Sequence, residues 1–390
     1  MHEDTPAGVP AGAPPRAGDD DLHAQWQRVV GRRSFLKGVG LAGAAAVPGS
    51  ALLAGEAFAK SSRITEGDVA ILRFLAAAEL IESDLWSQYA ELGGANGGNA
   101  AYVGALQNLD TDMPQYISDN TDDEISHARF LNAYLHSKGA KGVNLDEFRT
   151  LPSSKATGAR QVGRLTNLQA LDVDTSWYTR YRSTSNPDLG AKFPQAVTIR
   201  NQPAIPVSDQ DTPPNHKQPT GPPFTSEESR MQAIANTAGF HFAMIEQGGS
   251  SLYSTMALKA SSLEVLRIVV AIGGVETNHF SLWHDKAGNA VSQPLAGVTD
   301  PETGLHFPDL NASGGEATQT NLILPEPAKF IPGLPDVSIV RPTLDKNAGA
   351  MAAIRGLTAD QLFKGQSPRF FQTVMRLARA ADSAQRRLGH

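Results

Sequence analysis

Apolar residues recur every three or four positions in four stretches of the chain, the spacing that places them on one face of an α-helix. The first stretch follows residues 65–68 (Thr-Glu-Gly-Asp), which have the form of a capping box and predict a helix start. The second opens after Asp112, with Pro114 in its first turn and Gly139 suited to the position after its end. Together they predict a pair of helices within residues 64–139.

The other two stretches predict a second helix pair within residues 225–288. One helix is expected to start near Thr225, and the next follows a short turn at 260–262, so the two must be antiparallel neighbours. The predicted fold is all-α, a four-helix bundle in which residues 140–224 form a long crossover insertion between the pairs. Residues 289–390 are predicted to form an extension rich in Pro and Gly. It is expected to return to helix at 347–354, 358–363 and 369–386.

The second and fourth predicted helices each carry one Glu-x-x-His motif, Glu124 with His127 and Glu276 with His279. Residues three apart lie on the same helix face, so each motif directs a carboxylate and an imidazole the same way. A single motif of this length is weak because it arises by chance. Two copies, one in each half of the chain, indicate a metal site.

The first and third predicted helices each place a glutamate within the apolar face. Trp86 follows Glu79 after seven residues, and Tyr253 follows Glu246 after the same interval. Two such glutamates and two Glu-x-x-His motifs are the ligand set of a dinuclear metal site in a four-helix bundle. The predicted ligands are Glu79, Glu124, His127, Glu246, Glu276 and His279.

Two alternatives remain open at this point. Glu82 lies one turn beyond Glu79 and has Tyr89 seven residues on, so it could replace or join Glu79 as a ligand. Residues 121–124 (Thr-Asp-Asp-Glu) also have the form of a capping box, in which Glu124 would cap a shorter helix. The apolar spacing that continues upstream through Ile117 favours the longer helix.

With these motifs the chain resembles the ferritin-like superfamily. More narrowly, residues 68–86 (DVAILRFLAAAELIESDLW) resemble exported bacterial ferritin-like domain proteins, a group that includes plant desiccation-related proteins. The resemblance implies that Glu124 and Glu276 bridge two metal ions and that the other four predicted ligands are terminal.

The resemblance also implies a set of residues behind the ligands. Asp123, directly before a bridging glutamate, is expected to hydrogen-bond His279. Val275 stands at the matching position in the other half and cannot do this, so His127 needs another partner. Trp86, where relatives often have Tyr, and Tyr253 are expected beside the site.

Residues 1–59 predict an export signal. The pair Arg32-Arg33 precedes a weakly apolar run at 38–55, and Ala57-Phe58-Ala59 has the form of a cleavage site. This order resembles a twin-arginine signal, which implies the twin-arginine export machinery as a partner and a periplasmic or secreted protein. Because that route carries folded proteins, it suits a protein that receives its metal before export.

Composition limits the chemistry further. The chain has no cysteine, which excludes disulfides, iron–sulfur clusters and thiol catalysis. Any metal must be held by oxygen and nitrogen, which suits iron, manganese or zinc, and two ions of Fe or Mn are the expected cofactor. The net charge of −6 is mild and no basic stripe occurs, so nucleic acid is not an expected partner.

Two functions therefore stay open. A centre of two iron or manganese ions would make the protein an oxidoreductase that acts on dioxygen or peroxide. Alternatively, the bundle is not catalytic and has a structural role or protects the cell under stress or desiccation. The long segments 140–224 and 289–390 argue against a closed ferritin cage, whereas other oligomers stay open. The sequence does not decide whether the protein is an enzyme.

Overall fold

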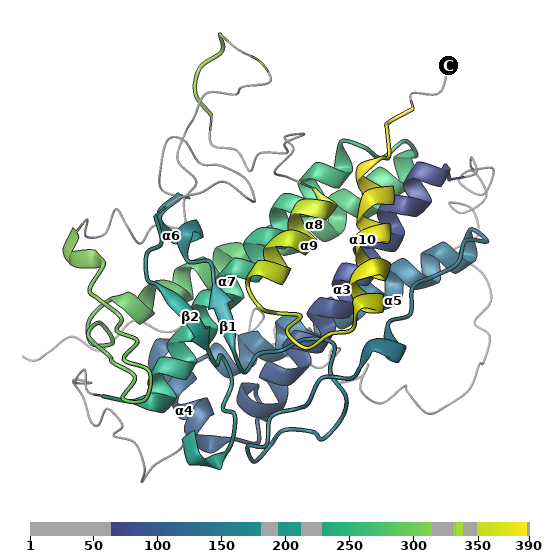
Figure 1. Cartoon of the computed structure of the whole chain (residues 1–390). Helices are drawn as coiled ribbons and strands as arrows, with labels where there is room; N and C mark the ends of the chain where they lie inside the picture. Colours follow the sequence, from purple (N-terminus) through teal and green to yellow (C-terminus); the bar gives the residue numbers. More distant parts are fainter. Residues whose placement is uncertain are drawn as a thin grey trace, which may run out of the picture. The chain divides into compact units, whose positions relative to one another are not determined.

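The computed structural model describes residues 64–180, 194–211, 228–313, 331, 333–337 and 349–387. Its longest helices are α3 (Glu66–Gly93), α5 (Met113–Ser137), α7 (Arg230–Ala257) and α8 (Leu263–Gly288). Helix α3 packs mainly against α5, and α7 packs mainly against α8 (Figure 1). This arrangement confirms the predicted all-α bundle of two helix pairs. The predicted export signal, with Arg32, Arg33, Ala57 and Ala59, lies outside the described residues.

The first helix pair begins and ends where the sequence predicted. Thr65 accepts a hydrogen bond from the backbone N–H of Asp68, and the Asp68 carboxylate accepts one from the backbone N–H of Thr65. Helix α5 runs without a break from Met113, so the alternative start at residue 121 is wrong. Gly139 has a φ of 73°, the left-handed conformation in which glycine commonly follows a helix end.

The third long helix starts later than predicted. Helix α7 begins at Arg230 and not near Thr225, which lies outside the described residues. Ser229 is its N-cap, because the Ser229 side chain accepts a hydrogen bond from the backbone N–H of Gln232. Helix α8 follows after a short turn and is capped in the same way by Ser262. The two helices are therefore antiparallel neighbours, as predicted.

Short elements fill the connections between the long helices. Helix α4 (Ala100–Leu109), which the sequence analysis did not anticipate, lies between α3 and α5 in the chain and packs on α7. The crossover insertion contains β1 (Leu171–Val173), α6 (Ser176–Arg180) and β2 (Ile199–Gln202). The two strands pair in antiparallel fashion.

Asp84 of α3 holds the crossover insertion on the bundle. Its Oδ2 accepts hydrogen bonds of 2.9 Å from the backbone N–H groups of both Leu165 and Thr166. Its Oδ1 lies 2.6 Å from Nη1 of Arg149. Because Asp84 is only 2% exposed, these partners are what makes the buried carboxylate tolerable.

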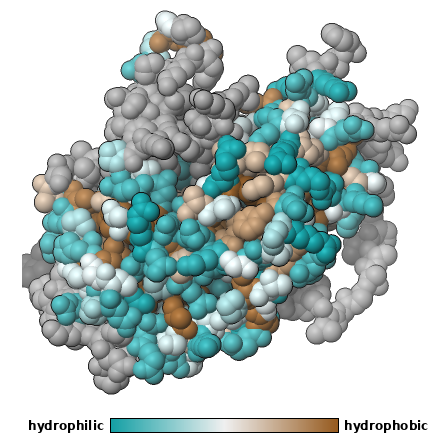
Figure 2. All heavy atoms as spheres, viewed as in Figure 1, coloured by the Kyte–Doolittle hydropathy of each residue, from teal (hydrophilic) through white to brown (hydrophobic). Residues whose placement is uncertain are grey.

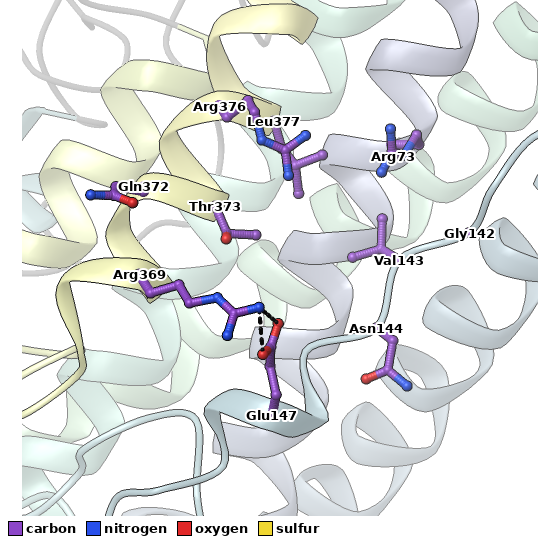
Figure 3. Close-up of a pocket in the computed structure, with 10 residues that line it drawn as sticks. All are labelled: Arg73, Gly142, Val143, Asn144, Glu147, Arg369, Gln372, Thr373, Arg376 and Leu377. Carbon is purple, nitrogen blue, oxygen red and sulfur yellow. Dashed lines mark hydrogen bonds and ion pairs between the residues drawn. The ribbon is translucent and has the colours of Figure 1, made fainter.

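The C-terminal extension returns to pack on the bundle. It contains α9 (Ala350–Ala359) and α10 (Pro368–Asp382), and α10 lies along α3 (Figure 1). The prediction of two separate helices at 347–354 and 358–363 is wrong, because Gly356 continues the helix and turns follow Ala359. Arg369 of α10 pairs with Glu147 of the insertion at 3.0 Å (Figure 3).

The last helix is shorter than the predicted 369–386, since it ends at Asp382. The Asp382 carboxylate accepts hydrogen bonds of 2.8 Å from the backbone N–H groups of Ala350 and Met351, which caps the start of α9. Thus the end of one helix fixes the beginning of the other. Within the part of the chain that the structure describes, no helix combines the length and apolar character needed to cross a bilayer.

Candidate metal centre

The four long helices bring all six predicted ligands together in the interior of the bundle. Their ligand atoms form two overlapping groups, and within each group the atoms lie within 4.8 Å of one another. Glu124 and Glu276 belong to both groups. The first group is Glu79, Glu124, His127 and Glu276, and the second is Glu124, Glu246, Glu276 and His279.

Both imidazoles direct Nδ1 into the carboxylate cluster. The Nδ1 atom of His127 lies 3.4 Å from Glu79, 3.2 Å from Glu124 and 3.3 Å from Glu276. The Nδ1 atom of His279 lies 3.0 Å from Glu124 and 3.3 Å from Glu246. Each histidine therefore faces one terminal and at least one shared carboxylate.

Several ligand atoms in this cluster are buried without a hydrogen-bond partner. In the described part of the chain they are Glu79 Oε2, Glu246 Oε2, both oxygens of Glu276 and His279 Nδ1, most of which lie 3.0–3.4 Å from an oppositely charged atom without hydrogen-bond geometry. Buried polar atoms in native proteins are nearly always paired, so each such atom calls for an explanation. All of these atoms are electron-pair donors, and cations bound among them would pair them together. The residues present therefore fit a metal site.

The pKa values reflect carboxylates and imidazoles crowded together away from water. Burial raises the pKa of Glu79 to about 8, and the negative charge of Glu124 adds to the rise. Burial would also raise the pKa of Glu124, but the hydrogen bond with His127 and the adjacent imidazole of His279 bring it down to about 2. Burial would lower the pKa of His127, but hydrogen bonds to the carboxylates, Glu124 foremost, raise it to about 12. Protonated imidazoles thus supply positive charge that bound metal would replace.

Asp123 lies behind His279, as the resemblance implied. The Nε2 atom of His279 is 3.1 Å from Oδ2 of Asp123. With its proton on Nε2, His279 donates to Asp123 and keeps the Nδ1 lone pair free to bind a metal. The Asp123 side chain is 52% exposed, so it links the buried cluster to the surface.

Asn120 orients two of the glutamates, a role that the sequence analysis missed. Its Nδ2 donates hydrogen bonds of 2.9 Å to Glu124 and 3.0 Å to Glu246. Its Oδ1 accepts one of 2.7 Å from the indole N–H of Trp283. The sequence does contain a signal for this role: Asn120 is an amide on the apolar helix face, one turn before Glu124, and a buried polar group there needs a hydrogen-bond partner.

The aromatic residues that follow Glu79 and Glu246 have different roles. The hydroxyl of Tyr253 donates a hydrogen bond to Oε1 of Glu79, across the bundle. In contrast, the indole N–H of Trp86 has no hydrogen-bond partner among the described residues. The Trp86 ring stacks on Trp283 at 5.4 Å and so supports the residue that holds Asn120.

Two glycines allow α7 and α8 to approach beside the cluster. A Cβ atom at Gly249 would lie 2.5 Å from Oε2 of Glu276, and one at Gly273 would lie 2.8 Å from Cβ of Tyr253. Both helices continue through these positions without a bulge. Gly249 thus leaves room for the Glu276 carboxylate. Gly273 leaves room for Tyr253, which donates a hydrogen bond to Glu79.

Glu82 belongs to neither group of ligand atoms among the described residues. It lies on α3 one turn beyond Glu79 and lines a neighbouring cavity instead. Burial raises the pKa of Glu82 well above its ordinary value, and the charges of Glu276 and Glu124 add to this rise.

A four-helix bundle with buried carboxylates and imidazoles belongs to the class of proteins whose metal sites are built from side chains on facing helices. The sequence model of the ferritin-like domain matches residues 67–289, which is more than half of the chain. The chain belongs to this ferritin-like domain family. No curated protein and no solved structure shows a significant match to the chain.

Proposed function

We propose that the protein binds two ions of iron or manganese in the carboxylate–histidine cluster and reacts there with peroxide or dioxygen. The observation that carries the proposal is the pair of carboxylates, Glu124 and Glu276, that belong to both groups of buried carboxylate and imidazole atoms. In this proposal Glu124 and Glu276 bridge the ions. The terminal ligands are Glu79, His127, Glu246 and His279.

The protein's own residues prepare the site for this chemistry. A bound dinuclear centre would supply the redox reactivity. Asn120 restricts the side-chain conformations of Glu124 and Glu246 by donating a hydrogen bond to one oxygen of each. Tyr253 holds Glu79, and Asp123 accepts a hydrogen bond from Nε2 of His279, so that Nδ1 faces the carboxylate cluster. Such surrounding hydrogen bonds set ligand orientation before any metal arrives.

Counting metals in the purified exported protein tests this proposal. The expected result is close to two Fe or Mn ions per chain, lost in a Glu124→Ala/His127→Ala variant. An Asp122→Ala/His136→Ala variant is the matched control, since both residues are exposed on the same helix. A folded wild-type protein without bound metal would contradict the ligand assignment.

Peroxide turnover by the metal-loaded protein then separates the two remaining functions. Turnover that disappears in the Glu124→Ala/His127→Ala variant would support an oxidoreductase. Two bound metals without turnover of peroxide or dioxygen would favour the alternative, a structural or stress- and desiccation-protective protein. The resemblance of residues 68–86 to desiccation-related proteins supports that alternative.

We also propose that the protein is exported by the twin-arginine machinery to the periplasm or the outside of the cell. The support is the sequence of Arg32-Arg33, the weakly apolar run and Ala57-Phe58-Ala59. A site assembled from four packed helices suits a route that carries folded proteins, because the metal can bind before export.

A further inference from the structure

A cavity of about 630 Å³ lies among α3, α7 and α9, with further walls from the insertion and from residues after α9. This volume falls within the range in which proteins bind small organic molecules. Helix α9, which belongs to the C-terminal extension, closes one side. Figure 2 shows apolar side chains gathered along this helix. The extension therefore helps to form a partly open pocket on the bundle.

The cavity adjoins the metal-binding cluster. Gly249 lines the cavity and also contacts the cluster, because a Cβ atom on it would come 2.5 Å from Oε2 of Glu276. Glu82 lines the cavity from α3, one turn from Glu79. Gly249 thus lies beside both the cavity and a carboxylate proposed to bridge the ions, and it has no side chain to keep them apart.

The walls favour an uncharged, apolar occupant. Hydrocarbon side chains make up about half of the wall residues, among them Phe74, Ile81, Leu85, Leu252 and Ile354. The wall also carries the charged residues Asp174, Arg200, Arg355 and Asp360, which are exposed or half-buried, and 73% of the Arg200 side chain is in contact with solvent.

An ion of either sign would lose its hydration against the apolar walls. An alcohol or a similar neutral polar group loses far less hydration free energy than an ion. Its hydroxyl group can form a hydrogen bond with the Glu82 carboxyl group.

We propose that this cavity binds an uncharged, mainly apolar organic molecule carrying a single hydroxyl or carbonyl group, next to the metal-binding cluster. The proposal rests on the proposed function in one respect, that the neighbouring cluster holds the dinuclear centre. The cavity would then hold an organic molecule of this class beside the metal ions.

Calorimetric titration of the exported protein with octan-1-ol tests the proposal, with octanoate as the anionic counterpart. Octan-1-ol is expected to bind at one site, and octanoate at least about tenfold more weakly. An Ala353→Trp variant fills the cavity from α9 and is expected to weaken octan-1-ol binding at least about tenfold. Met351→Trp is the control, because Met351 is on the same helix but outside the cavity wall.

Metal content measured on the same samples separates this proposal from the proposed function. If the wild type holds two metals but shows no saturable octan-1-ol binding, the cavity proposal is overturned. Equal affinity in the Ala353→Trp variant would overturn it too. If octan-1-ol binds and Ala353→Trp abolishes the binding while no sample contains metal, the cavity is supported and the dinuclear centre fails.

Line broadening of octan-1-ol protons gives the distance readout. Protein loaded with Mn²⁺ is expected to broaden these NMR lines far more than protein loaded with Zn²⁺, since only the former is paramagnetic. Equal broadening by both would place the alcohol away from the cluster and contradict the proposal.

Discussion

At Gly249 the absence of a single methyl group makes room for a ligand. A Gly249→Ala variant would place Cβ 2.5 Å from Oε2 of Glu276, so the carboxylate must move. We expect this variant to lose most of its bound metal while it remains folded, as measured by metal content beside circular dichroism. Retention of the full metal content would show that Glu276 can shift without leaving the site.

Gly274 provides the matched control one helix away. A Cβ atom there would meet nothing within 4 Å, and the position is exposed within α8. We therefore expect Gly274→Ala to keep its metal and to gain about 1 kcal/mol in free energy of unfolding, because alanine favours a helix over glycine.

His241 makes stability depend on pH. Burial lowers its pKa to about 3, and its Nδ1 lies 2.7 Å from the hydroxyl of Tyr89. Between pH 6.5 and about 3 the unfolded chain binds a proton at this histidine and the folded chain does not. The free energy of unfolding must therefore fall as pH falls through that window, by about 1.4 kcal/mol per pH unit from this residue.

The comparison with a His241→Phe variant measures this contribution. The variant is expected to be less stable at neutral pH, because Tyr89 loses its partner, but to lose less stability below pH 6.5. Denaturant unfolding at several pH values would give both slopes. Equal slopes for the two proteins would mean that His241 is protonated in the folded state.

At the scale of elements, one carboxylate connects α3 to the crossover insertion. Replacing Asp84 by alanine leaves the two backbone N–H groups and Arg149 without their shared buried acceptor. We expect Asp84→Ala to lower the free energy of unfolding by about 3–5 kcal/mol, measured by denaturant titration.

Asp146→Ala is the control for this element. It removes another contact of Arg149, but the Asp146 side chain is 72% exposed. Its effect is expected to stay within about 0.5 kcal/mol. A similar loss of free energy of unfolding in both variants would show that the contribution of Asp84 does not depend on its burial.

At the scale of the whole molecule, export and metal loading are proposed to be linked. An Arg32→Lys/Arg33→Lys variant is expected to remain inside the cell, whereas Arg28→Lys, outside the motif, is expected to be exported normally. Fractionation followed by N-terminal sequencing checks this, with the exported chain expected to begin near Lys60. Export of the double variant at the wild-type level would contradict the twin-arginine proposal.

The sequence by itself determined the four long helices of the bundle and the candidate ligands. Helix periodicity and caps such as Thr65 depend on neighbours within a few residues, so they can be read locally. The same holds for the two Glu-x-x-His motifs, whose faces follow from helix geometry. Asp123 was expected from the resemblance to ferritin-like proteins, which implies a hydrogen bond to His279 from the residue directly before a bridging glutamate.

Only the tertiary structure decided which residues complete the site and which stay out of it. Asn120 and Trp283 are on different helices, and their contact with Glu124 and Glu246 exists only after those helices pack. The same packing places Glu82 against a cavity that α9 closes. Contacts between residues far apart in the chain leave no periodic pattern in the sequence, because they depend on how whole helices meet.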